Sequence, residues 1–98
     1  EWRREALANN IAQLKQELQS LRWKLLPSVT PIQPLLIGES HETVRISQQL
    51  RERGLLVPAI RPPTVPQNTA RLRISLSAAH LPQDIRRLTQ ALQELAAA

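Results

Sequence analysis

The chain contains no cysteine, methionine, phenylalanine or tyrosine, and only two glycines among its 98 residues. Without cysteine it can form no disulfide, no thiolate nucleophile and no cysteine metal site, which fits a reducing compartment. Its only large aromatic side chains are Trp2 and Trp23, so a platform for stacking nucleic-acid bases is poorly supplied. No apolar run approaches the roughly 20 residues of a membrane span and no signal-peptide pattern opens the chain. We therefore expect a soluble, cytoplasmic protein with no membrane partner.

The net charge is +5, from eleven arginines and two lysines against eight acidic residues. A basic chain makes nucleic acid a legitimate hypothesis. However, the arginines are spread along the chain, eight of them in four pairs, and are interspersed with acidic residues, and no helix-turn-helix, zinc-finger or RNP pattern is present. No two histidines and no paired carboxylates fall at metal-ligand spacing either. We expect neither a nucleic-acid partner nor a metal site.

Apolar residues spaced four and three apart predict a first helix over residues 2–21. They are Leu7, Ile11, Leu14, Leu18 and Leu21. This stripe can pack on the chain's own domain alone, or also on a helix or domain outside it. Because the sequence starts at Glu1 without an initiator methionine, we expect a fragment or processed product of a longer chain.

Residues that are typical of helix ends predict two more helices. Ser40 is a candidate N-cap for a helix over residues 41–53, and Gly54 can supply the left-handed residue that ends it. The last helix begins at Pro82, with Asp84 in its first turn. Its apolar stripe consists of Ile85, Leu88, Leu92 and Leu95.

Three short apolar segments predict strands, at residues 32–38, 55–60 and 71–76. Pro34 and Pro58 interrupt the first two. Because proline has no N–H for the ladder, these parts should lie at an edge or a bulge. The order of elements predicts one small α+β domain, in which helices cover one face of a three-stranded, mostly antiparallel sheet.

The most informative stretch is residues 60–77. A loop with three prolines, residues 61–66, leads into the last strand, in which Arg71 and Arg73 share one face while apolar residues share the other. Because its prolines limit the conformations of the loop, the loop and the strand together would hold an arginine side chain at a defined position. A site that binds a substrate carboxylate needs a positive charge placed in this way. Because both side chains lie on the same face of the strand, the alternation alone does not show whether Arg71 or Arg73 would bind the carboxylate.

Residues 28–38, 51–66 and 69–80 closely resemble the α-oxoamine synthases, which are pyridoxal-phosphate enzymes of the aspartate-aminotransferase fold (fold type I). The Arg-Pro-Pro-Thr-Val-Pro loop resembles the 8-amino-7-oxononanoate synthase branch of that family. The resemblance covers essentially the whole chain and matches the C-terminal small domain. It implies that residues 1–21 are an interdomain-type helix and that residues 22–98 are the small domain proper.

This resemblance implies a C-acyltransferase that condenses a pimeloyl thioester with L-alanine, releasing CO2 and the free carrier, in biotin biosynthesis. Its cofactor would be pyridoxal phosphate, held by the large domain. The implied partners are L-alanine, pimeloyl-CoA or pimeloyl-acyl carrier protein, that large domain, and a second subunit in a homodimer.

Residue by residue, Arg73 matches the arginine that grips the amino-acid carboxylate, and Thr64 matches a threonine that contacts substrate. The Schiff-base lysine is expected upstream, so no catalytic or cofactor-binding residue is assigned here and the 98 residues alone should be inactive. His80 is expected to have a local structural role. The alternatives are another α-oxoamine synthase, or a stand-alone small-ligand binding module without catalysis.

Overall fold

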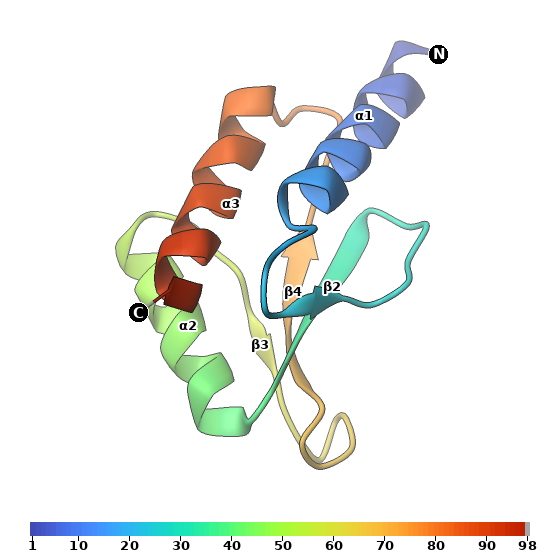
Figure 1. The fold of residues 1–98 in the computed structure, drawn as a ribbon. Helices are drawn as coiled ribbons and strands as arrows, with labels where there is room; N and C mark the ends of the chain where they lie inside the picture. Colours follow the sequence, from blue (N-terminus) through green and yellow to red (C-terminus); the bar gives the residue numbers. More distant parts are fainter. Residues whose placement is uncertain (98) are drawn as a thin grey trace.

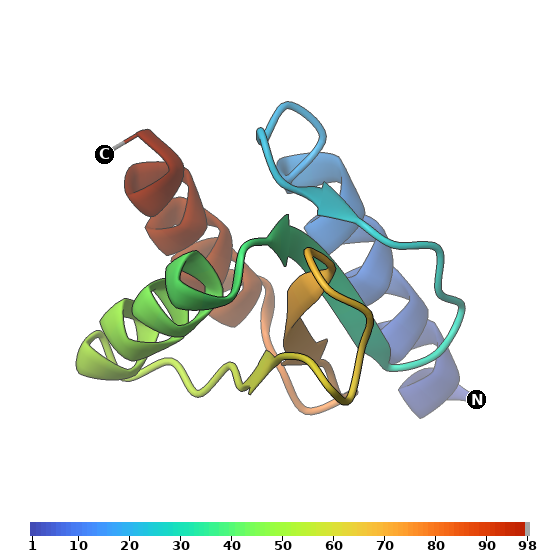
Figure 2. The same ribbon diagram turned by 90° about the horizontal axis from the view of Figure 1, so that it is seen from below.

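The computed structural model describes residues 1–97, which form three helices and a four-stranded antiparallel sheet (Figures 1 and 2). The elements are α1 (Trp2–Glu17), β1 (Lys24–Leu25), β2 (Ile32–Gly38), α2 (Ser40–Glu52), β3 (Ala59–Ile60), β4 (Ala70–Ser75) and α3 (Pro82–Ala97). The strand order is β1-β2-β4-β3. The predicted α+β class is confirmed, but the predicted three strands are wrong by one. With two residues, β1 is too short for an alternating pattern to reveal it.

One hydrophobic cluster joins the inner face of the sheet to all three helices. On β4, Leu72 and Ile74 are buried, with 0% and 2% of their surface exposed, whereas the residues that alternate with them face outward. The predicted stripe of α3 is buried at all four positions, Ile85, Leu88, Leu92 and Leu95. The helices therefore cover one face of the sheet, as predicted. Among residues 1–97, no helix is long and apolar enough to cross a membrane.

The first helix ends earlier than predicted, at Glu17 instead of residue 21. Leu18 and Leu21 are nevertheless buried, because a tight turn in which the Leu21 N–H donates to the Leu18 carbonyl (3.1 Å) keeps both side chains on the core. The apolar spacing located the buried side chains correctly. It could not locate the helix end, because a turn can continue the same buried stripe.

The cap of α2 is Glu39 and not Ser40. The Glu39 carboxylate accepts hydrogen bonds from the backbone N–H groups of His41 (2.9 Å) and Glu42 (2.8 Å), and these bonds lower the pKa of Glu39. Serine and carboxylate side chains both cap helices, so neighbouring candidates are hard to separate from sequence. At the other end, Gly54 adopts φ +81° and closes the helix as predicted.

The two strand prolines lie where ladders end. The Pro34 carbonyl accepts a hydrogen bond from the Leu26 N–H (2.8 Å), but proline has no N–H to return, and β1 pairs with β2 no further. Pro58 directly precedes the edge strand β3, which is shorter than the predicted strand over residues 55–60. The expectation of local edges at both prolines agrees with this arrangement.

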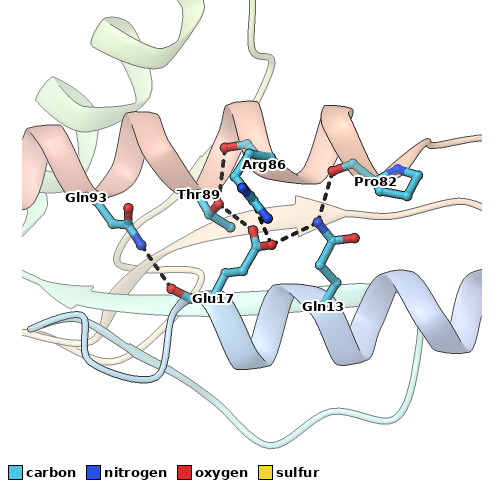
Figure 3. A network of polar contacts seen from close by, with 6 residues as sticks. All are labelled: Gln13, Glu17, Pro82, Arg86, Thr89 and Gln93. Atoms are coloured by element: carbon cyan, nitrogen blue, oxygen red, sulfur yellow. Dashed lines mark hydrogen bonds and ion pairs between the residues drawn. The ribbon is translucent and has the colours of Figure 1, made fainter.

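A polar network joins the end of α1 to α3 (Figure 3). The Glu17 carboxylate accepts hydrogen bonds from Thr89 Oγ1 (2.7 Å), Gln13 Nε2 (2.9 Å) and Arg86 Nε (3.2 Å). The Glu17 backbone carbonyl accepts another from Gln93 Nε2 (3.0 Å). A single carboxylate thus fixes the register of two helices that are more than sixty residues apart in the chain.

We predict that Glu17→Gln lowers the free energy of unfolding by roughly 1–2 kcal/mol at pH 7. Partial burial opposes ionisation of Glu17, but hydrogen bonds from Thr89, Gln13 and Arg86 outweigh it and lower its pKa below the ordinary 4.5. A lowered folded-state pKa stabilises the fold above the unfolded value, and this contribution is lost as pH falls through the folded-state pKa. Urea unfolding at several pH values should show the difference from wild type shrinking on acidification.

Glu5→Gln is the matched control, since Glu5 lies exposed on the same helix. It should change the unfolding free energy by less than about 1 kcal/mol. Equal effects of the two substitutions at pH 7 would contradict the role given to Glu17.

Candidate functional site

The outer face of β4 carries the candidate cations. Arg71, Arg73 and Ser75 point away from the core, as the alternation predicts. Arg73 is exposed, whereas Arg71 is half-buried. The face opposite the helices therefore presents guanidinium groups on the more central part of the sheet, because β4 lies between β2 and β3.

The structure distinguishes Arg71 from Arg73, which the alternation along the strand could not do because both lie on the same face. Arg71 Nε donates a hydrogen bond to the Thr69 carbonyl (3.1 Å), so this guanidinium is tied to the loop that precedes β4. Within residues 1–97, no hydrogen bond or ion pair engages the Arg73 guanidinium. Arg73 is thus available for an external anion, and Arg71 is committed to holding the loop.

The strand residues that share this face include no carboxylate. Residues directly opposite each other on neighbouring strands have side chains on the same face. The register places Ile32, Pro34 and Leu36 of β2 beside Ser75, Arg73 and Arg71, and Lys24 of β1 beside Leu36. An unpaired guanidinium on such a face suits an anionic ligand, for which arginine's planar fork matches two carboxylate oxygens.

Thr64 lies on the loop between β3 and β4, which projects beyond the end of the sheet (Figure 1). A turn brings the Thr64 N–H onto the Arg61 carbonyl (3.1 Å), and the Pro62–Pro63 peptide within it is cis. A second turn closes the loop, with Thr69 Oγ1 donating to the Pro66 carbonyl (2.5 Å). The Thr64 side chain is exposed, and no hydrogen bond of the described chain joins it to the Arg73 side chain.

A separate cleft among the described residues lies away from the Arg73 guanidinium. It has a volume of about 370 Å³ and runs between the segment after α2, the end of β4 and the start of α3. Its lining residues are Gly54, Leu55, Leu56, Val57, Ile74, Ser75, Leu76, His80, Asp84, Ile85, Arg87 and Leu88. Sequence reasoning missed this cleft, because its walls come from three separate segments and no local pattern marks it.

Three polar side chains of this cleft, His80, Asp84 and Arg87, form hydrogen bonds within the fold. His80 Nδ1 accepts a hydrogen bond from the Ser77 N–H (3.0 Å), so in the neutral ring the proton lies on Nε2. Asp84 accepts from the Leu81 N–H (2.7 Å), and Arg87 donates to a backbone carbonyl at the end of α2 (3.2 Å). His80 therefore has the local structural role expected of it. We place the candidate site at Arg73 and not in the cleft.

The two lysines are surface groups bonded to backbone carbonyls. Lys15 Nζ donates to the Ser28 carbonyl (3.3 Å) and Lys24 Nζ to the Gln19 carbonyl (3.4 Å). Residues 1–97 hold no group of three or more histidine or acidic side chains able to bind a metal ion. These residues offer one exposed, unpaired guanidinium able to bind an anion, on a strand whose backbone is held in the sheet.

The sequence matches the family described as aminotransferase class I and II over residues 1–92. A relative in Nitrosomonas eutropha, named 8-amino-7-oxononanoate synthase, is 66% identical over 95 residues, which is 97% of this chain and 24% of that protein. A relative of the same name in Pseudomonas savastanoi is 55% identical over 95% of this chain. The chain spans about a quarter of the length of these curated relatives.

Solved structures share the fold. A serine palmitoyltransferase from S. paucimobilis, solved with a bound PLP–myriocin aldimine, superposes with a TM-score of 0.85 at 27% identity, covering 96% of this chain and 24% of that one. An 8-amino-7-oxononanoate synthase from Francisella tularensis gives 0.79 at 22% identity, covering 93% and 26%. The matches confirm the resemblance and fold family predicted from sequence.

We predict that Arg73→Ala changes the free energy of unfolding by less than about 0.5 kcal/mol, whereas Arg71→Ala lowers it by about 0.5–1.5 kcal/mol. The two substitutions are identical in chemistry, strand and face, so strand propensity cancels between them. Only Arg71 loses a hydrogen bond, the one to Thr69. Urea unfolding of the two variants measures the difference. A greater loss for Arg73→Ala would show that Arg73 has a partner within the fold.

Proposed function

Because the chain belongs to the aminotransferase class I and II family, we propose that it is the carboxylate-binding small domain of a pyridoxal-phosphate-dependent C-acyltransferase. The reaction of the whole protein would condense a pimeloyl thioester with L-alanine to 8-amino-7-oxononanoate, CO2 and free carrier, in biotin synthesis. The curated relatives with 53–66% identity carry the name 8-amino-7-oxononanoate synthase, which supports this reaction. The observation that carries the proposal is the unpaired Arg73 guanidinium on a face without carboxylates.

Arg73 would hold the carboxylate of the amino-acid substrate. Its backbone is fixed in the sheet, where the Arg73 N–H donates to the Pro58 carbonyl (2.9 Å). A guanidinium on a fixed strand can form two parallel hydrogen bonds to one carboxylate, and such bonds are about twice as strong as neutral ones. Binding there orients the substrate's α-carbon and amino group toward the rest of the protein.

Thr64 would donate or accept one hydrogen bond with a substrate. Prolines on both sides and the turn onto Arg61 restrict its loop, so little conformational entropy is lost when the hydroxyl is used. Since no internal hydrogen bond uses this hydroxyl among residues 1–97, it remains available to a ligand.

The residues of this chain do not fit a pyridoxal-phosphate site. Such a site needs a lysine in a cavity, whereas Lys15 and Lys24 are exposed and donate to backbone carbonyls. The cofactor, which would supply the electron sink for bond making and breaking, would be held by other parts of a protein about four times as long. The 98 residues alone would then be inactive.

We further propose the division of the chain that its resemblance implies. Residues 1–21 would form the connection to the large domain, with α1 (Trp2–Glu17) as its helical part, and residues 22–98 the small domain. The intact enzyme would be a cytoplasmic homodimer that uses pimeloyl-CoA or pimeloyl-acyl carrier protein.

The fold match to serine palmitoyltransferases makes another α-oxoamine synthase the second candidate. Comparing alanine, glycine and serine as substrates separates the two.

We predict that Arg73→Ala in the full-length enzyme lowers kcat/KM for alanine by about 1.5–3 kcal/mol, which is roughly 10- to 150-fold. Arg73→Lys should recover only part of this loss, because an ammonium lacks the planar fork. Steady-state kinetics with alanine as the varied substrate measures the effect.

Arg71→Ala is the control for Arg73→Ala, and it should change alanine kinetics far less. If Arg73→Ala leaves the alanine half-reaction unchanged, the carboxylate assignment is wrong. A borohydride-sensitive visible band formed by this 98-residue chain with pyridoxal phosphate would contradict the absence of a cofactor lysine.

We predict that Thr64→Val lowers kcat/KM roughly two- to tenfold, the effect of one neutral hydrogen bond, while Thr64→Ser retains most activity. Valine keeps the shape of threonine, so the comparison isolates the hydroxyl. Equal activity of the valine and serine variants would exclude a hydrogen-bonding role for Thr64.

A further inference from the structure

Arg73 lies between two prolines, one on each neighbouring strand. Pro34 of β2 is its direct partner in the antiparallel register. On the other side, the ladder that pairs Ala59 with Leu72 brings Pro58 opposite Arg73, whose N–H donates to the Pro58 carbonyl (2.9 Å). Direct cross-strand partners have side chains on the same face, about 4.5–5.5 Å apart at Cβ. Both proline rings therefore flank the Arg73 stem.

At the level of Arg73 the two prolines end the outer ladders, β1–β2 and β3–β4, while the central β2–β4 ladder continues to the Ile32–Ser75 pair. Pro58 accepts the Arg73 N–H but has no N–H to give to the Arg73 carbonyl, so the β3–β4 pairing stops there. Pro34 directs its carbonyl toward the β1 side, where Leu26 donates to it, and again returns no bond. The Pro34–Arg73 pair is then a non-hydrogen-bonded pair, the kind in which side chains approach most closely.

The two proline side chains also offer the Arg73 guanidinium no hydrogen-bond acceptor that could compete with a substrate carboxylate. A proline ring has no polar atom, so neither direct neighbour can accept a hydrogen bond from Arg73 or neutralise it. The same-face neighbours along β4 are Arg71, which is a like charge tied to Thr69, and Ser75. Most other side chains at these two positions would bring either a polar tip or a longer, more mobile stem.

We propose that Pro34 and Pro58 are positioning residues for Arg73. Their rings restrict the aliphatic part of the Arg73 side chain from both sides. They also leave its guanidinium unpaired, so that the positive charge is available to a substrate carboxylate. This inference rests on the proposed function, because the prolines position Arg73 for a substrate only if Arg73 binds the amino acid. A role in ending ladders alone would affect stability, but it would not distinguish a charged from a neutral replacement.

The test compares glutamate with glutamine at each proline in the full-length enzyme. Both replacements restore the same N–H and nearly the same shape, so the pairs Pro34→Glu with Pro34→Gln, and Pro58→Glu with Pro58→Gln, differ in charge only. A carboxylate directly opposite Arg73 would compete with the substrate. We expect the glutamate variants to show a KM for alanine roughly two- to fivefold above the glutamine variants, as for a cross-strand ion pair.

Three readouts connect the effect to Arg73. The KM difference should shrink as salt is raised, and the KM for the pimeloyl thioester should be equal within each pair. In an Arg73→Ala background the glutamate–glutamine difference should disappear, because the two positions act through that residue. Pro31 is the matched control, since it precedes β2 and its carbonyl accepts the Leu76 N–H without flanking Arg73. Pro31→Glu and Pro31→Gln should have the same KM for alanine.

The outcomes separate this inference from the proposed function. Equal KM values within both pairs, while Arg73→Ala still impairs alanine use, would overturn the positioning role and leave the carboxylate assignment standing. If Arg73→Ala has no effect, the assignment itself is wrong. Circular dichroism checks folding of each variant, and if one position does not tolerate substitution, the pair at the other position decides.

Discussion

The alternation of side chains along β4 is the constraint on which the rest of this structure depends. Leu72 and Ile74 are buried against the helices, while Arg71 and Arg73 point the other way. A slip of one residue in the pairing with β2 would turn the arginines into the core and the apolar residues into solvent. Burying an unpaired guanidinium is far more costly than exposing a leucine, so the register is strongly specified. The position of the cation is therefore set by the same packing that forms the fold.

The helices stabilise this register from one side by two different means. The core side chains of α2 and α3 pack as a continuous apolar cluster with the inner face of the sheet. The contact between α1 and α3 adds a polar hub at Glu17, in which three donors converge on one carboxylate (Figure 3). Apolar packing is tolerant of small shifts, whereas a carboxylate with three partners has one geometry. The hub thus fixes α1 relative to α3.

Much of the fold could be predicted from sequence because its signals are periodic. The stripe of α3 and the two-faced β4 follow from side chains repeating at the period of their element, and Gly54 follows from the residue type that commonly ends a helix. The missed features lack such a signal. The two-residue β1 is shorter than any repeat, and the end of α1 is hidden because the turn after Glu17 continues its buried stripe. Glu39 displaced Ser40 as the cap because both side chains can accept from the same amides.

For the site, the sequence pattern placed two arginines on one face, and only their hydrogen bonds in the structure distinguished them. The bond from Arg71 to Thr69 spans only two residues, but the side-chain conformation that forms it is not encoded in a periodic pattern, and the flanking prolines of Arg73 arise from cross-strand register. The most direct test of the central claim is the structure of the full-length enzyme with alanine bound. This account predicts two Arg73 guanidinium nitrogens at about 2.7–2.9 Å from the two oxygens of the substrate carboxylate. A carboxylate bound elsewhere, with Arg73 paired to an acidic side chain of the enzyme, would contradict it.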